Sequence, residues 1–243
     1  MKTLVLLPTY NEKENIERMV DAILQLEHHP QLEQLGITEV LILIVDDNSP
    51  DGTGELAEKL REKHPSNIHV IHRKERGRGT AGIAGFKYAL TQDVDYIIEM
   101  DADFSHNPGD IPRFLRETKN CDVVIGSRFV PGGQSVKRNF IRDLISKGAG
   151  LYSRLTLGMN IKDWHGGYKC YGKQALASLN FDDFFSKGYS IGMETLYRLA
   201  KSGWSYKEIP ITFRERAQGK SKFSAKEMLT YAKVALQLRW GRI

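Results

Sequence analysis

The chain has 243 residues, of which 41% are hydrophobic, and a formal net charge of +5. This length and apolar content suit one large domain with a full-sized core and exclude a disordered chain. Its two cysteines are too few for a disulfide framework and favour a reducing cytosolic compartment, while the positive charge suggests an anionic partner.

The first segment, residues 1–8, resembles a core strand, because it lacks the basic start and the cleavage site of a secretory signal. No uninterrupted apolar run reaches the roughly 18 residues that a membrane-spanning helix requires. We therefore expect a cytoplasmic protein that meets a membrane only peripherally, at its cytoplasmic face.

Short apolar runs in the first half of the chain are typical of β-strands: residues 2–7, 40–45, 68–71, 96–100 and 123–125. The segments between the first four are long enough for helices, and apolar residues recur at helical spacing over 16–24 and 53–64. Pro30 and Gly36 indicate a return loop before the second strand. The alternation predicts a single α/β domain with a mostly parallel sheet flanked by helices.

The second half of the chain has a looser pattern. An amphipathic segment covers about 141–155, and another helix is expected near 191–201. The last predicted helix, 225–240, places apolar residues on one face: Met228, Leu229, Ala232, Ala235, Leu236 and Trp240. We expect a catalytic domain over 1–222, followed by a C-terminal amphipathic, membrane-surface helix over 223–243. Within that domain, the donor half covers about 1–126 and the acceptor half about 127–222.

Polar motifs follow several predicted strands, at the end where an open parallel sheet binds its ligands. They are Pro8-Thr9-Tyr10-Asn11-Glu12, Asp46-Asp47-Asn48-Ser49-Pro50-Asp51-Gly52-Thr53 and Asp101-Ala102-Asp103. Hard cations such as Mg²⁺ prefer oxygen ligands and complete their shell with water and substrate phosphates. Asp101 and Asp103 therefore suit a metal–diphosphate site, although an ordinary acidic turn has the same pattern.

The second acidic motif favours the metal interpretation. Carboxylates gathered at two strand ends raise each other's pKa unless a cation or hydrogen-bond donors compensate. We expect Asp47 to accept hydrogen bonds from a nucleobase or ribose. Ser49 or Asp51 can also cap the helix that starts near Thr53, so this loop serves structure and function together.

Further segments carry candidate anion-binding groups, each with a structural alternative. Residues 76–82 are glycine-rich but match no phosphate-binding fingerprint, which favours a turn that opens a helix. Arg128 and Arg142 are candidates for an anionic acceptor, against a solvated basic face. Residues 213–222 are expected to form a lid over a diphosphate, a charged loop that attracts lipid headgroups, or both.

Taken in order, these motifs resemble a known family. They are Pro-Thr-Tyr-Asn-Glu, Val-Asp-Asp-Asn-Ser-Pro-Asp-Gly-Thr, Met-Asp-Ala-Asp-Phe-Ser-His-Asn-Pro, Gly-Ser-Arg-Phe-Val-Pro-Gly-Gly and, after Arg214, Gly-Lys-Ser-Lys. The chain closely resembles the polyprenol (dolichol) phosphate mannose synthases, which are inverting family-2 glycosyltransferases of GT-A, or Rossmann-like, fold. The resemblance runs from about Leu4 to Lys222.

The resemblance implies where the donor and its metal bind. The guanosine nucleotide would contact Pro8, Tyr10, Glu12, Val45 and Asp47. Asp101 and Asp103, on either side of Ala102 in the donor site, would hold Mg²⁺ or Mn²⁺. Relatives often carry Gln at the position of Ser105, which leaves this residue an open candidate for a further metal ligand.

The resemblance also implies cationic groups for both phosphates. Arg214 and Lys220 would meet the donor diphosphate. Arg128 and Arg142, with Ser146, would receive the lipid phosphate. The two arginines that bind the acceptor would then act in catalysis together with the paired aspartates of the metal site.

The sequence departs from many relatives in two respects. Residues 163–170, Asp-Trp-His-Gly-Gly-Tyr-Lys-Cys, stand where those relatives have a Thr-Ser-Gly-Phe-Arg type of sequence. Many relatives also continue into membrane-spanning segments. The resemblance therefore implies a peripheral enzyme with 225–240 as an interfacial helix, or one that relies on a small membrane-anchoring subunit.

The implied reaction moves mannose from GDP-mannose to a polyprenyl (dolichyl) phosphate, whose oxygen attacks C1 from the face opposite GDP. A phosphate monoester has a second pKa of about 6, so the acceptor is largely a dianion at neutral pH and needs no strong general base. One alternative is another donor such as UDP-glucose. A basic nucleic-acid-binding protein is a second alternative, disfavoured because strand-end carboxylates repel a phosphate backbone.

Overall fold

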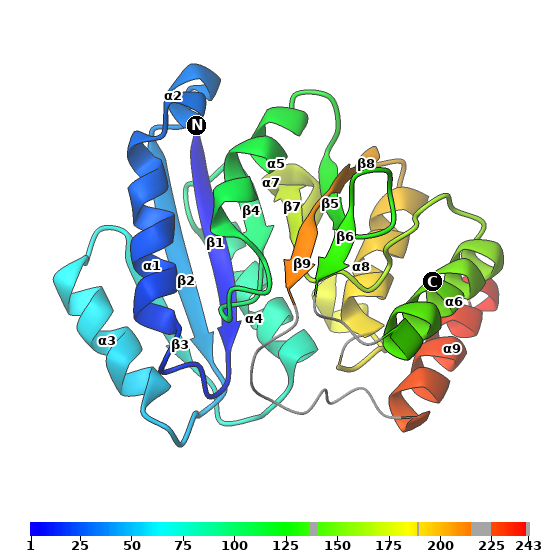
Figure 1. Ribbon diagram of the computed structural model, residues 1–243. Coiled ribbons are helices and arrows are strands. Elements are labelled where there is room, and N and C mark those ends of the chain that lie inside the picture. The colour runs from blue at the N-terminus through cyan, green and yellow to red at the C-terminus, as the bar shows by residue number, and fades with distance from the viewer. Residues whose placement is uncertain (137–139, 189, 215–224, 242–243) are drawn as a thin grey trace.

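The computed structural model describes residues 1–136, 140–188, 190–214 and 225–241 (Figure 1). Its strands are β1 (Lys2–Thr9), β2 (Glu39–Asp46), β3 (Ile68–His72), β4 (Tyr96–Glu99), β5 (Val123–Ser127), β6 (Gln134–Val136), β7 (Lys169–Gly172), β8 (Tyr206–Pro210) and β9 (Thr212–Arg214). Its α-helices are α1 (Ile16–Leu24), α2 (Pro30–Leu35), α3 (Thr53–Lys63), α4 (Arg78–Thr91), α5 (Ile111–Glu117), α6 (Phe140–Leu157), α7 (Lys173–Ala177), α8 (Ser190–Lys201) and α9 (Ala225–Trp240). Short 3₁₀ helices are η1 (Gln25–His28), η2 (Pro108–Asp110) and η3 (Phe181–Asp183).

The main sheet has the order β3-β2-β1-β4-β7-β5-β8, and its parallel pairs are β1·β2, β1·β4, β2·β3 and β5·β8. This confirms the mostly parallel sheet and all the strands predicted for the first half. β7 was not predicted and runs antiparallel to both of its neighbours, β4 and β5. A separate two-stranded ribbon pairs β6 with β9.

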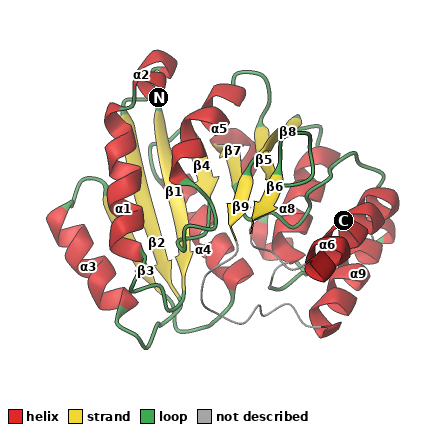
Figure 2. Ribbon diagram, in the orientation of Figure 1, coloured by secondary structure: helices red, strands yellow, loops and turns green. Residues whose placement is uncertain are grey.

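Helices cover both faces of the main sheet (Figure 2). Along β1, Val5 and Leu7 pack with residues of α1, α3 and α5, whereas Leu4 and Leu6 pack with residues of α4, α8 and α9. A central parallel strand is buried on both faces, so β1 has an almost continuous apolar sequence. The carboxyl ends of β1, β2 and β4 are therefore fixed by a closely packed core on both faces of the sheet.

The predicted return loop around Pro30 was wrong, because residues 30–35 form the short helix α2. Pro30 occupies the first helical position, where a missing N–H costs nothing. Gly36 ends the helix in the left-handed region with φ 72°, which glycine adopts without strain. The two residues interpreted as loop markers are thus the start and stop signals of a helix.

The C-terminal helix α9 packs against α6 and α8 and is not a detached appendage. Tyr231, Val234 and Leu238 lie in the core, whereas Leu229 and Trp240 are exposed. The predicted apolar face of this helix is therefore largely a solvent-facing surface. No described helix is both long and apolar enough to cross a membrane.

Candidate active site

Loops at the carboxyl ends of β1, β2 and β4 form the candidate site, and each contains a residue with left-handed backbone. These residues are Asn11 (φ 59°), Asn48 (φ 54°) and Phe104 (φ 60°). Asparagine tolerates this region, but an aromatic residue there costs free energy that the surrounding structure must offset. Such strain concentrates at functional sites, which makes the loop carrying Phe104 the strongest candidate.

The loop after β1 places the predicted nucleotide-binding residues at one edge of the site. The guanidinium of Arg76 lies 3.6 Å from the centre of the Tyr10 ring. Glu12 is buried and accepts a hydrogen bond of 2.9 Å from the Asn15 side chain. Pro8 and Val45 are directly paired across β1 and β2. The structure thus brings these residues together at the carboxyl ends of β1 and β2.

The neighbouring aspartates after β2 have different surroundings. Asp46 accepts hydrogen bonds from the Ser49 hydroxyl (2.5 Å) and backbone N–H (3.0 Å), so its role is to fold its own loop. Asp47 accepts from Arg73 Nη1 at 2.5 Å and from the Gly77 N–H at 2.7 Å. Sequence reasoning missed Arg73, because its partner is remote in the sequence. A carboxylate has about four acceptor positions, so these bonds still allow Asp47 to contact a ribose or base.

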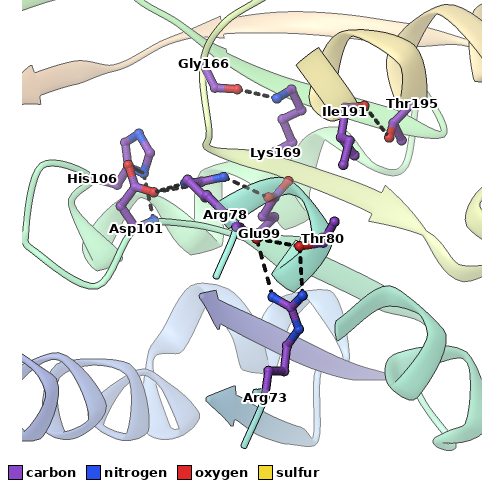
Figure 3. Close-up of polar contacts among 11 residues, drawn as sticks. Arg73, Arg78, Thr80, Glu99, Asp101, His106, Gly166, Lys169, Ile191 and Thr195 are labelled. Carbon is purple, nitrogen blue, oxygen red and sulfur yellow. Dashed lines mark hydrogen bonds and ion pairs between the residues drawn. The ribbon is translucent and has the colours of Figure 1, made fainter. Parts of the chain in front are cut away.

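Arg78, the first residue of α4, lies at the centre of the site (Figure 3). Its Nε lies 2.9 Å from Asp101 Oδ1, Nη2 donates to the same oxygen, and Nη1 lies 3.1 Å from Glu99 Oε1. The segment before it does open a helix, as predicted, but the functional signal was this arginine and not the glycines. Arg73 and Arg78 supply part of the positive charge that the gathered carboxylates require.

The residues of the Asp-Ala-Asp motif fit a hard divalent cation. Asp101 and Asp103 offer carboxylate oxygens, Ala102 is buried, and the buried Ser105 hydroxyl has no hydrogen-bond partner among the described residues. The Ser105 N–H donates to Asp103 Oδ1 at 3.0 Å, which fixes the turn. In the described chain no cluster of three or more His, Cys, Asp or Glu is placed to hold a metal. Substrate phosphates and water would therefore complete the shell.

The buried side chain of His106 contacts the backbone of this loop. Its Nδ1 accepts a hydrogen bond of 3.0 Å from the Asp101 backbone N–H, and its ring stacks on Tyr168 at 5.0 Å. Burial lowers the pKa of His106 to about 4, so the imidazole is neutral at neutral pH and Nδ1 can accept. His106 therefore supports the backbone at the start of the acidic motif.

Arg128, a predicted acceptor-binding residue, is buried in a bidentate ion pair with Asp163. Both Arg128 Nε and Nη2 lie 2.7 Å from Asp163 oxygens, and the Arg128 N–H donates to the same carboxylate at 3.0 Å. This pair anchors the 163–170 segment, in which the sequence departs from relatives, to the end of β5. Ser146 lies on α6, and the side chain of Arg142 is outside the described residues.

Arg214, expected to meet the donor diphosphate, is exposed at the end of β9, and its N–H donates to the Ser105 carbonyl at 3.1 Å. It lines a cleft of about 540 Å³ between the β6·β9 ribbon and the segment from Asn107 to Arg113. The described lining of this cleft includes neither aspartate of the metal motif. Lys220, its predicted companion, lies outside the described residues.

Comparisons with known proteins identify the family of the chain. Residues 4–179 match the family described as Glycosyl transferase family 2. The chain is 41% identical to a polyprenol monophosphomannose synthase of Mycolicibacterium smegmatis, covering 92% of this chain and 81% of the relative. It is 39% identical to an undecaprenyl-phosphate mannosyltransferase of Micrococcus luteus (99% and 94%) and 38% identical to a dolichol-phosphate mannosyltransferase of Pyrococcus furiosus (99% and 64%).

Solved structures share the fold at lower sequence identity. The chain superposes on the glucosyl-3-phosphoglycerate synthase of Mycobacterium tuberculosis, solved with Mn²⁺, UDP-glucose and glycerol 3-phosphate, with a TM-score of 0.67 and 19% identity. That match covers 100% of this chain and 81% of the other. The α/β architecture with the Asp-Ala-Asp motif at a strand end is therefore a GT-A fold, and the chain belongs to glycosyl transferase family 2.

Proposed function

We propose that the protein transfers mannose from GDP-mannose to a polyprenyl phosphate, with inversion at C1. The observation that carries this proposal is the pair Asp101 and Asp103 at the end of β4, in a chain 38–41% identical to three proteins named for mannose transfer to polyprenyl-type lipids. A metal–diphosphate site alone fits any sugar nucleotide. The names of the relatives favour a mannose donor and a polyprenyl phosphate acceptor among these possibilities.

The order of strands suggests how the donor lies across the site. β2 and β1 carry the proposed nucleotide-binding residues Asp47 and Tyr10, and β4 follows next in the sheet with Asp101. The nucleoside would occupy the β1–β2 edge, and the diphosphate would reach the end of β4. A divalent cation held by Asp101 and Asp103 would neutralise charge on the departing diphosphate.

The chain's own groups would align the acceptor without a strong base. A lipid phosphate is largely a dianion at neutral pH, so its oxygen can attack C1 without losing a proton to the protein. Arg142 and Ser146 on α6 are the proposed direct contacts. Arg128 is already bound to Asp163, so we assign it the role of positioning the end of β5. Any N–H donor that it has left would contact the acceptor phosphate.

A donor panel tests the proposed function. Purified protein with Mn²⁺ and a polyprenyl phosphate is expected to form mannosyl lipid from GDP-mannose, and to form at least about tenfold less glycosyl lipid from UDP-glucose or UDP-N-acetylglucosamine. Product is measured by extraction of radiolabelled lipid. Preference for a uridine donor would overturn the assignment of mannose, and salt-sensitive binding of oligonucleotides without donor binding would revive the nucleic-acid alternative.

We further propose that α6 and α9 rest on a membrane surface. Both helices expose large apolar side chains: Leu144, Leu151 and Leu155 on α6, and Leu229, Leu236 and Trp240 on α9. Cationic side chains accompany them, including Lys147 and Arg154. Apolar area combined with positive charge favours peripheral binding to anionic lipids.

The membrane proposal predicts the behaviour of a double variant. Leu155 and Trp240 are 72% and 71% exposed, so replacing both by glutamate should leave the fold intact. Binding to phosphatidylglycerol vesicles, followed by flotation, is expected to fall at least about tenfold. The control is Met1→Glu, made behind an added initiator methionine. Met1 is exposed and lies at the amino end of β1, away from α6 and α9 (Figure 1). Unchanged flotation of the double variant would place the membrane contact elsewhere on this chain, whereas failure of the wild type to float would point to a membrane-anchoring subunit.

A further inference from the structure

A second, smaller cavity borders Asp101, and no ligand has been assigned to it above. It measures about 80 Å³ and lies where the ends of β4 and β7 meet the first turns of α4 and α8. Asp101 and Arg78 form one side of it, and Lys169, Glu99 and Trp164 also line it. A cavity of this size holds several water-sized groups, so it suits a set of ligand hydroxyls.

Two buried ionisable side chains, Glu99 and Lys169, face this cavity and form no ion pair with each other. Glu99 and Lys169 are directly paired across the antiparallel strands β4 and β7, so their side chains leave the same face of the sheet. Both are almost fully buried, at 6% and 2% exposure. Yet Glu99 binds Arg78, while Lys169 Nζ donates to the Gly166 carbonyl, its single acceptor among the described residues (Figure 3).

The remaining lining includes one unpartnered polar group and several glycines. The indole N–H of Trp164 is buried, with the residue 1% exposed, and has no hydrogen-bond partner in the described chain. Glycine forms much of the wall: a Cβ at Gly192 would lie 3.3 Å from Lys169 Nζ, and one at Gly82 would lie 3.3 Å from Glu99 Oε1. A buried donor without a partner is costly, so the Trp164 N–H beside an open space indicates that a polar group, from a ligand or from water, fills that space.

We propose that this cavity binds the hexose of the sugar-nucleotide donor, with Lys169 and Glu99 hydrogen-bonding to its ring hydroxyl groups. The inference rests on the proposed function, because it requires a donor whose diphosphate lies at Asp101 and Asp103. The sugar is bonded directly to that diphosphate, so it must occupy space next to Asp101. This cavity meets that condition, whereas the described lining of the larger cleft beside Arg214 does not.

The chemistry of the lining matches a sugar edge. A hydroxyl group can donate to the Glu99 side chain and accept from Lys169 Nζ at the same time, which joins the two buried side chains through the ligand. The Trp164 N–H can donate to a further hydroxyl. When the hydroxyl edge of the sugar lies inside the cavity, its C1 atom points toward Asp101 and the diphosphate. Lys169 and Glu99 thereby become residues that select the sugar, separate from those that hold the nucleotide.

The test compares the binding of a sugar nucleotide with that of its free nucleotide. Calorimetry with Mn²⁺ measures GDP and GDP-mannose on the wild type and on Lys169→Met. The ratio of the two affinities is expected to fall at least about tenfold in the variant, while GDP affinity stays within about twofold. A parallel loss of GDP affinity, or an unchanged ratio, would overturn the proposal.

Gly192→Ala is a second variant that guards against a failure of Lys169→Met to fold. Alanine is the better helix former, so the change inside α8 should not unfold the protein. Its methyl group presses on Lys169 Nζ and should lower the same affinity ratio. Gly148→Ala on α6 is the matched control, because an added Cβ there meets nothing within 4 Å and should leave the ratio unchanged.

Failure of the proposed function gives a different result from failure of this inference. If the wild type prefers UDP-glucose, the assignment of mannose is wrong, and the affinity ratio is then followed with UDP and UDP-glucose in the same variants. If the hexose of the preferred donor adds nothing to binding in the wild type, or if Gly192→Ala and Lys169→Met leave its contribution intact, the cavity is not the sugar site.

Discussion

Replacing Asp103 by alanine is expected to lower the rate of mannosyl transfer at least about a hundredfold, because several kcal/mol of metal-dependent stabilisation of the leaving diphosphate would be lost. The fold should survive, since the described hydrogen bond that the variant loses, from the Ser105 N–H, is worth about 1 kcal/mol. Transfer from GDP-mannose measures the first effect, and urea denaturation measures the second.

Asp103→Asn separates charge from loop geometry. The amide oxygen can still accept the Ser105 N–H, so this variant should keep the stability of the wild type yet lose transfer nearly as fully as the alanine variant. Asp93→Ala is the control, because the Asp93 side chain is 96% exposed at the opposite end of the sheet. Normal transfer by Asp103→Asn would contradict the assignment of Asp103 to the metal.

Replacing Asp163 by alanine is expected to destabilise the protein by about 3–5 kcal/mol, because Arg128 is left buried without its counter-ion. Urea denaturation measures the loss. Asp182→Ala provides the comparison: its ion pair with Lys87 is exposed, and its removal should cost less than about 1 kcal/mol. The double change Arg128→Met with Asp163→Leu should be less damaging than Asp163→Ala alone. An equal effect of Asp163→Ala and Asp182→Ala would show that the buried pair is not a structural anchor.

The same pair predicts how stability depends on pH. Burial alone would raise the pKa of Asp163, but the adjacent Arg128 guanidinium outweighs burial and lowers this pKa from 3.8 to about 2. The unfolded carboxyl therefore takes up a proton before the folded one does, so its contribution is complete above about pH 4 and declines toward pH 2. The difference in unfolding free energy between the wild type and Asp163→Ala should shrink over that interval.

Local patterns predicted the strands in the first half of the chain and the polar loops that follow three of them. Runs such as residues 40–45 are apolar enough to be recognised as buried strands, and the polar motifs follow them directly. β7 has only four residues, one of them Lys169, and its place between β4 and β5 depends on contacts remote in the sequence. No local signal specifies such a pairing.

The partners of the charged residues were also beyond sequence reasoning. Asp46 and Asp47 are adjacent, yet the first bonds its own loop and the second bonds Arg73, a difference set by the two sides of the strand. The sequence predicts that Arg128 binds the acceptor phosphate, but in the fold its guanidinium is paired with Asp163. Spacing indicates which residues gather at a strand end, whereas three-dimensional packing decides which charges are already paired.

The position of β7 has a consequence for how the chain acquires its structure during synthesis. β1 to β4 are contiguous in the sheet and early in the sequence, so they can assemble as soon as they leave the ribosome. β5 emerges next but has no place beside β4 until Lys169–Gly172 has been translated. In that interval the edge of β4 is open to strands of other nascent chains. The antiparallel insertion thus makes the growing polypeptide most prone to aggregation midway through translation.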